Sequence, residues 1–197
     1  EPFQIAVGVH GALTCRAGWV AEGPQDLPDG ARDYATKLAG PYFDCAAAWY
    51  ETVGLGVTGG ELDALVKARL GDPFFGVSLN PGHLIHLDEW MHSPIYPVSK
   101  ETLRSGQALQ LDIIPATGTV YGTANIEDGI VLLDECSRSD FKRRYPDAWT
   151  RMEARRCFMA DNLNIHLKPE VLPLSNLTGY FAPFMLAPGN VFVAGNA

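Results

Sequence analysis

Three residues in the middle of the chain carry side chains that bind divalent cations or transfer protons. They are His83, Asp112 and Glu127, and each lies in a segment with strand-like patterning. A buried imidazole or carboxylate costs free energy unless it is paired, hydrogen-bonded or bound to a metal. If the three segments are neighbouring strands, about 4.8 Å apart, the side chains could converge on one divalent cation. The residues alone therefore indicate a candidate metal site, although their spacing matches no compact local motif.

The surroundings of the two acids leave alternatives open. Strand alternation over residues 108–114 places Leu109 and Leu111 on one face and Gln110 and Asp112 on the other. The polar face is typical of either a pocket lining or a solvated sheet surface. Glu127 precedes an apolar run and is either a turn residue or a ligand. From this segment alone, the turn is the favoured interpretation.

Two further histidines are the candidate catalytic residues, His92 and His86. His86 follows His83 by three residues, so in a straight strand the two imidazoles point to opposite faces and do not share one metal. His92 follows Trp90 in a predicted loop, and loops often carry catalytic groups.

Alternating and helical patterns predict the elements that must position these residues, and their order is typical of an α+β fold. The predicted strands are residues 3–9, 12–21, 74–79, 82–87, 108–115, 119–125 and 129–133, of which the first two form a hairpin around His10 and Gly11. Helices are predicted over residues 31–53, with a break at Gly40–Pro41, and over residues 139–162. A third helix starts at the capping box of Thr58 and Glu61 and stops at Gly71.

Composition narrows the function classes. The chain has 197 residues, is 47% hydrophobic and carries a net charge of −8, which is typical of a globular protein and argues against nucleic acid as a partner. No apolar stretch reaches the ~20 residues that span a bilayer, so no membrane partner is expected. The four cysteines are scattered, which favours a reduced, cytoplasmic protein. The start at Glu1 without methionine predicts a fragment or processed form of a longer polypeptide.

Three ordered motifs resemble the catalytic domain of the pita-bread family, which includes aminopeptidase P, prolidase, methionine aminopeptidase and creatinase. Residues 82–87 (GHLIHL) resemble the family's Gly-His-Gly-Ile-Gly-Leu segment. Residues 103–112 resemble its Leu-x-x-Gly…Glu-Pro stretch, and residues 125–128 (NIED) resemble Arg-Ile-Glu-Asp. The resemblance covers roughly residues 3–135. It implies a curved antiparallel sheet with helices on its outer face, and it puts His83, Asp112 and Glu127 at metal-ligand positions.

The chain departs from this family in its first hairpin, from which the metallopeptidases take two aspartates. Residues 3–21 contain no carboxylate, and His10 and Cys15 are the potential ligands there. Two carboxylates, Asp112 and Glu127, balance one divalent cation, whereas a second would face a desolvation cost of several kcal/mol. We therefore expect at most one divalent metal (Mn, Zn or Co), or none, and no two-metal mechanism.

The resemblance implies three alternative functions. The first is a divergent Xaa-Pro aminopeptidase or dipeptidase with at most one metal, in which His92 shuttles a proton. The second is a metal-free hydrolase similar to creatinase, with His83 as the acid or base. The third is a non-catalytic peptide-binding pseudoenzyme. The expected ligand is a small peptide or small amide, and a homodimer is expected.

Two segments are expected within one domain. Residues 1–138 form the catalytic-like domain, which is expected to lack a preceding segment or N-terminal domain. Residues 139–197 form a C-terminal helix and an extended tail that pack on the same domain. Their expected role is in packing or in dimer contacts. The alternative for the tail is a lid over the cleft through Tyr180, Phe181 and Phe184.

Overall fold

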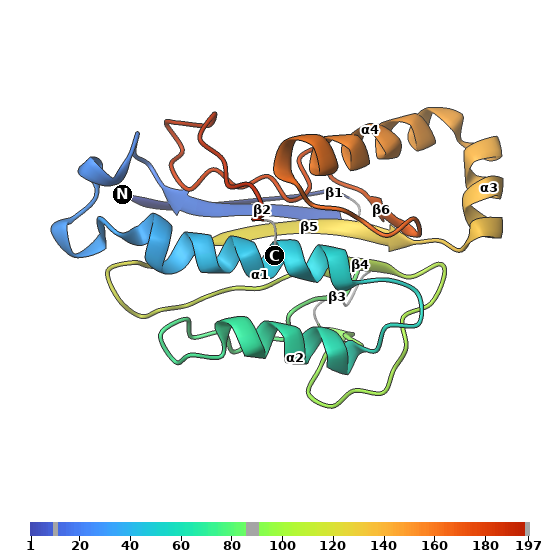
Figure 1. Cartoon of the computed structure of the whole chain (residues 1–197), viewed down its shortest axis with the longest axis horizontal. Helices are drawn as coiled ribbons and strands as arrows, with labels where there is room; N and C mark the ends of the chain where they lie inside the picture. Colours follow the sequence, from blue (N-terminus) through green and yellow to red (C-terminus); the bar gives the residue numbers. More distant parts are fainter. Residues whose placement is uncertain (10–11, 86–90, 196–197) are drawn as a thin grey trace.

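One antiparallel sheet forms the centre of the molecule in the computed structural model, which describes residues 1–9, 12–85 and 91–195 (Figure 1). Its strand order is β1-β2-β5-β4-β3, and β6 pairs with β5. The strands are β1 Pro2–Val9, β2 Ala12–Trp19, β3 His83–Leu84, β4 Ala108–Leu111, β5 Asn125–Leu132 and β6 Val171–Pro173. The helices are α1 Gly40–Thr52, α2 Gly59–Leu70, α3 Glu135–Arg144 and α4 Pro146–Leu163, with short helical turns at Pro24–Asp26 and Asp29–Ala31 and a π-helix at Ala35–Ala39.

The first two strands confirm the predicted hairpin, since β1 and β2 pair along their whole length. The strand predictions for residues 74–79 and for residues 119–124 are wrong, because these segments form turns and irregular chain. Gly76 has a φ of 60°, and a Cβ there would lie 2.2 Å from the carbonyl oxygen of Ala116. Phe74 and Phe75 pack against the core without pairing in the sheet. An apolar run can thus be buried by packing alone.

Strand β5 is longer than predicted and is buried along almost its whole length. Seven of its eight residues are buried, and it pairs with β2, β4 and β6. Glu127 lies inside this strand, so the interpretation of Glu127 as a turn residue is wrong. Glu127 is 8% exposed, so most of its side chain is shielded from bulk water.

Helices α1 and α2 lie side by side, and α1 also contacts β4 of the sheet (Figure 1). The predicted capping box is confirmed, since Thr58 accepts a hydrogen bond from the Glu61 amide and Glu61 accepts one from the Thr58 amide. The expected break at Gly40–Pro41 is a change of hydrogen-bond pattern. Proline has no N–H to donate, and here it stands at the start of α1, directly after the π-helix.

Helix α1 holds β5 in place through one buried hydroxyl. The Tyr42 hydroxyl donates to the carbonyl oxygen of Ile126 (3.1 Å) and accepts from its amide (2.7 Å). Both residues are fully buried. Because Ile126 precedes Glu127, this contact fixes the backbone at the acid.

The predicted single helix over residues 139–162 is wrong, because the structure has two helices there. Tyr145 leaves helical geometry at φ −133° and ψ 60°, and Pro146 begins α4. Proline is favoured at a first helical position, where its missing N–H costs nothing. Asp134 caps α3 by accepting from the Ser137 amide at 2.7 Å.

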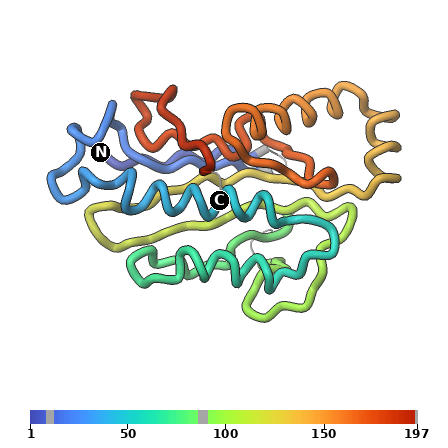
Figure 2. Tube along the Cα trace, in the orientation of Figure 1, coloured from blue at the N-terminus to red at the C-terminus, as the bar shows by residue number. Residues whose placement is uncertain are grey.

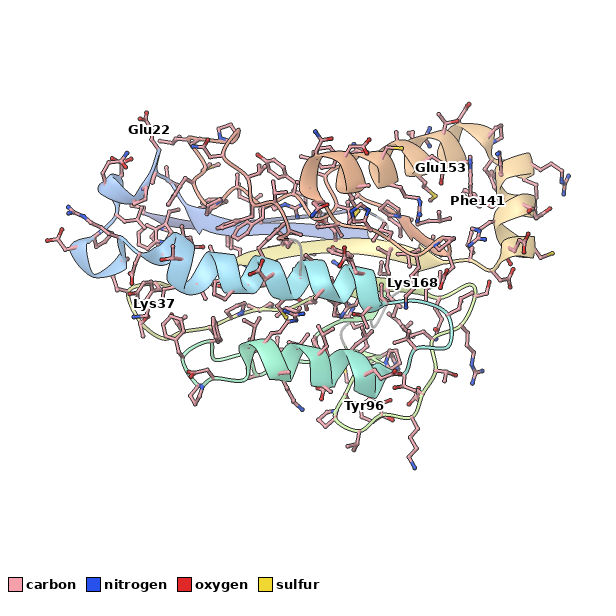
Figure 3. All side chains as sticks on the ribbon, in the orientation of Figure 1. Glu22, Lys37, Tyr96, Phe141, Glu153 and Lys168 are labelled. Carbon is pink, nitrogen blue, oxygen red and sulfur yellow. The ribbon has the colours of Figure 1, made fainter. Side chains whose placement is uncertain are left out.

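After α4 the chain returns across the sheet, as the trace in Figure 2 shows. The Met185 amide donates to the Trp19 carbonyl, which ties the tail to β2. Phe181 and Phe184 are buried, and Phe181 packs edge-on against Tyr42. These two rings therefore belong to the core rather than to a lid. Lys168 lies near the end of α1, where its ammonium group donates to the Thr52 carbonyl (Figure 3).

Among the described residues, none of the helices combines the length and apolar character needed to cross a membrane.

Candidate metal centre

The sheet register brings the three predicted ligands to one place. His83 on β3 pairs with Gln110 on β4, so the two side chains share a face of the sheet. Leu111 pairs with Asp128, and continuing that register by one residue sets Asp112 opposite Glu127. The three ligands thus come from three adjacent strands. His83 lies on β3 and Glu127 on β5, and Asp112 directly follows the last residue of β4.

The functional atoms of the three side chains are close together. His83 Nε2 lies 3.5 Å from Asp112 Oδ2 and 3.9 Å from Glu127 Oε1. One ligand atom from each residue lies within 4.8 Å of the other two. His83 is 1% exposed, and Asp112 and Glu127 are each 8% exposed. The alternative of a solvated sheet face is wrong for Asp112, which lies in a buried cluster.

Gly82 explains how His83 reaches this position. Its φ of 143° lies in a region that favours glycine, and a Cβ there would lie 2.7 Å from the carbonyl oxygen of Gln110. The glycine lets β3 approach β4 closely, immediately before the histidine. A glycine directly before His83 is therefore a local requirement of the backbone.

One hydrogen bond sets the tautomer of His83. Its Nδ1 lies 3.0 Å from the carbonyl oxygen of Leu84. A carbonyl oxygen can only accept, so Nδ1 carries the proton. In the neutral ring Nε2 then turns its lone pair toward Asp112 and Glu127, which is the arrangement of a metal-binding imidazole with an oriented second nitrogen.

Opposing effects act on the protonation of His83. Burial lowers its pKa, but the hydrogen bonds to Asp112 and Leu84 and the negative charges of Asp112 and Glu127 raise it by more. The net pKa is therefore above the usual value. The negative charges of the two carboxylates stabilise a positive charge at Nε2, which can be a proton or a metal cation.

Gln110 supports the centre from within the sheet. Its amide nitrogen donates to Glu127 Oε1 at 2.7 Å and to the Leu13 carbonyl at 2.9 Å. Gln110 is fully buried. The amide therefore fixes the Glu127 carboxylate and ties β4 to β2 across β5. Alternation along the strand had placed Gln110 on the same face as Asp112, but the sequence carries no signal for its contact with Glu127.

Asp112 has a buried oxygen without a hydrogen-bond partner among the described residues, namely Oδ1. Such a buried acceptor is costly unless something binds it. Imidazole and carboxylate groups suit manganese, zinc and cobalt. The orphaned oxygen and the donor set therefore fit one divalent cation held by His83, Asp112 and Glu127.

A cavity of about 530 Å³ opens onto the three residues. Among the described residues, Ser78, Leu79, Asn80 and Met91 also line it. None of these four residues was predicted to belong to the site. The Asn-Pro-Gly turn directly before His83 is the one sequence signal that could have pointed to Asn80.

The two candidate catalytic histidines have different outcomes. The His92 side chain is exposed, and its carbonyl oxygen accepts from the Leu84 amide. Among the described residues, Met91 lines the cavity and His92 does not. His86 lies outside the described residues, so its predicted position is untested.

Comparison with solved structures defines the fold. Dipeptidase PepE from Mycobacterium ulcerans superposes with a TM-score of 0.50 at 20% identity, covering 67% of this chain and 35% of that chain. The chain has the pita-bread fold. The prolidase from Pyrococcus horikoshii (TM-score 0.49, 14% identity, 67% of this chain and 37% of that chain) also matches. So does methionine aminopeptidase from Rickettsia prowazekii (TM-score 0.46, 14% identity, 67% and 60%).

This chain spans only part of each of the three proteins, between 35% and 60% of their lengths. No protein-family model and no curated protein sequence matches it. The likeness therefore concerns the architecture, and the chemistry has to be argued from the residues themselves.

Proposed function

We propose that this chain is a hydrolase of small peptide or amide bonds, of the Xaa-Pro peptidase type, which uses one divalent cation bound by His83, Asp112 and Glu127. The observation that carries the proposal is the convergence of these side chains, with ligand atoms within 4.8 Å of one another. They are buried and face a cavity. Manganese, zinc and cobalt all suit this donor set.

Charge supports one cation rather than two. Asp112 and Glu127 together balance two positive charges, and residues 3–21 of the hairpin contain no Asp or Glu. A second buried dication would lack compensating charge, at a cost of several kcal/mol.

Each residue of the centre has a distinct role. A divalent cation held by His83, Asp112 and Glu127 would supply Lewis-acid polarisation of a substrate carbonyl. His83 presents Nε2 to the centre because Leu84 holds Nδ1–H. Gln110 orients the Glu127 carboxylate. His92 is the proposed proton shuttle, and it would reach the cavity only by moving from its exposed position beside Met91.

The size of the cavity is suited to a small substrate. Its volume of about 530 Å³ lies within the range of ~300–1,000 Å³ that is usual for small-molecule sites. The solved structures that share the fold include proteins described as a dipeptidase and a prolidase. A dipeptide or a short amide fits both observations.

A non-catalytic peptide-binding module is the second candidate. The exposed position of His92, which does not line the cavity among the described residues, favours it. A metal-free hydrolase similar to creatinase is the third candidate. The raised pKa of His83 favours it, since an imidazolium there could act as an acid.

Turnover after metal loading tests the proposal. The protein is loaded with one equivalent of Mn²⁺, Zn²⁺ or Co²⁺ and assayed against a panel of Xaa-Pro dipeptides and a panel of creatine-like amides. We expect dipeptide hydrolysis that chelators abolish and that Glu127→Gln removes. Dipeptide binding without turnover by the loaded protein would instead support the binding module. Amide turnover that chelators leave unchanged would support the metal-free hydrolase.

A further inference from the structure

A buried thiol faces the candidate metal centre from the strand on its other side. Cys15 on β2 pairs directly with Glu127 on β5. Directly opposed residues of an antiparallel pair point to the same face, with Cβ atoms about 4.5–5.5 Å apart. Cys15 is 2% exposed. The row of side chains on this face therefore continues from His83 past Asp112 and Glu127 to Cys15.

Cys15 also has two nearby polar or charged groups besides the acids of the centre, Gln4 and Arg16. Burial and the negative charges of Glu127 and Asp112 raise the pKa of its thiol, against the lowering effect of Gln4 and Arg16. The side-chain amide of Gln4 approaches the sulfur at 3.5 Å.

The Asp112 carboxylate supplies an independent indication that the centre accepts a ligand. Asp112 is 8% exposed, lines the cavity, and has a buried Oδ1 without a hydrogen-bond partner among the described residues. His83, Asp112 and Glu127 offer three protein ligands. Zinc in proteins commonly takes four ligands in a tetrahedral set and can expand to five, so one position remains for a further protein ligand while a substrate carbonyl would still bind as the fifth.

We propose that Cys15 supplies the fourth protein ligand, as a thiolate, to the cation held by His83, Asp112 and Glu127. This inference rests on the metal site of the proposed function. The sulfur–metal bond forms as the S–H proton passes to the solvent, and no electron is transferred. The compact group of ligand atoms comprises His83, Asp112 and Glu127 and does not include the sulfur, so binding of the cation by Cys15 requires the sulfur to leave its contact with the Gln4 amide.

A thiolate in the ligand set determines which metal is preferred. Soft sulfur ligands favour zinc and cobalt over manganese and magnesium, which prefer oxygen. The structure thus assigns Cys15 the role of a selectivity residue, which narrows the three metals of the proposed function to zinc and cobalt. The thiolate also adds a third negative charge to those of Asp112 and Glu127.

The absorption spectrum of the Co²⁺-loaded protein tests this assignment without an activity assay. We expect wild type to show a sulfur-to-cobalt charge-transfer band in the near ultraviolet together with tetrahedral visible bands. Cys15→Ser should lose the ultraviolet band and still bind one Co²⁺ more weakly. Cys157→Ser is the matched control, because Cys157 is exposed on α4, and it should keep the band.

A second measurement needs no variant and covers the case in which Cys15→Ser does not fold. X-ray absorption of zinc-loaded wild type should show one sulfur neighbour at about 2.3 Å. Bound Co²⁺ without the charge-transfer band, or zinc with oxygen and nitrogen neighbours alone, would overturn the role of Cys15 and leave the three-residue site intact. Absence of any bound cation would overturn both. A band lost in Cys157→Ser would assign the sulfur elsewhere and also overturn the inference.

Discussion

Two neighbouring acids on β5, Asp128 and Glu127, face opposite sides of the same sheet and are satisfied very differently. Asp128 is fully buried. It receives a salt bridge from Arg16 at 2.8 Å, a hydrogen bond from the Thr14 hydroxyl at 2.6 Å and one from the Gly179 amide at 3.2 Å. A positive charge and two hydrogen-bond donors, from β2 and from the C-terminal tail, surround this carboxylate.

On the opposite face of the sheet, Glu127 and Asp112 lie beside His83. Glu127 accepts from Gln110 and lies 3.9 Å from His83, while one oxygen of Asp112 has no hydrogen-bond partner among the described residues. The histidine there can be neutral or charged. This difference between the two faces shows that burial alone does not distinguish a functional acid from a structural one. A structural carboxylate has its charge compensated permanently, whereas the candidate site keeps two carboxylates whose compensation can be exchanged.

The largest effect is expected from removing the permanent partner of Asp128. Arg16→Leu leaves a buried carboxylate without its cation, which should lower the free energy of unfolding by about 3–5 kcal/mol. Urea denaturation measures this. Arg32→Leu is the control, because the Arg32–Asp29 pair is exposed and is expected to contribute at most about 1 kcal/mol. Equal stability of the two variants would remove the structural role assigned to Arg16.

Asp112→Asn should have the reverse profile. In metal-free protein it removes one of two adjacent negative charges, so the free energy of unfolding should change by less than about 1 kcal/mol or rise. Its affinity for Zn²⁺ should fall by more than the ~10–100-fold typical of lost outer-shell partners. Unfolding and isothermal titration measure the two quantities. A loss of stability as large as that of Arg16→Leu would make Asp112 a structural acid.

Gln110→Leu tests the support of Glu127 and should have a smaller effect on metal binding. Loss of the amide donor frees the carboxylate, so Zn²⁺ affinity should fall by about 10–100-fold while one equivalent still binds. Gln25→Leu, on the exposed surface, should leave the affinity unchanged. An unaltered affinity in Gln110→Leu would show that Glu127 needs no positioning by this amide.

The smallest effect is expected from pH in the metal-free protein. The pKa of His83 in the fold lies above its usual value of 6.5. Its contribution to stability is therefore fully present below about 6.5 and is lost as pH rises through the folded-state pKa. The free energy of unfolding of wild type minus that of His83→Gln should fall over this range. A difference that rises with pH would contradict the ion pairing of His83 with the two acids.

Local patterns predicted the local structure well. The capping box of Thr58 and Glu61 and the β1–β2 hairpin are confirmed because their signals lie within a few residues of one another. The failed strands at residues 74–79 and 119–124 were apolar runs buried by packing, which alternation does not distinguish from pairing. Proline is favoured at the first position of a helix, so Pro146 indicates the start of α4, which the prediction of one long helix missed.

The site was predictable as a set of residue types, helped by the resemblance of three motifs. Its geometry was not, because strand register depends on contacts between distant segments. Nothing in the sequence near Glu127 indicates that Cys15 pairs with it or that Gln110 donates to it. The orphaned oxygen of Asp112 is likewise a property of the assembled sheet.

The number of cations bound per chain tests the central claim most directly. Freshly purified protein, stripped of metal and then titrated with Zn²⁺ by isothermal calorimetry, should bind one equivalent, and Glu127→Gln should lose this binding event. Two equivalents in wild type would contradict the single-cation site. So would the absence of binding, or binding that Glu127→Gln leaves unchanged.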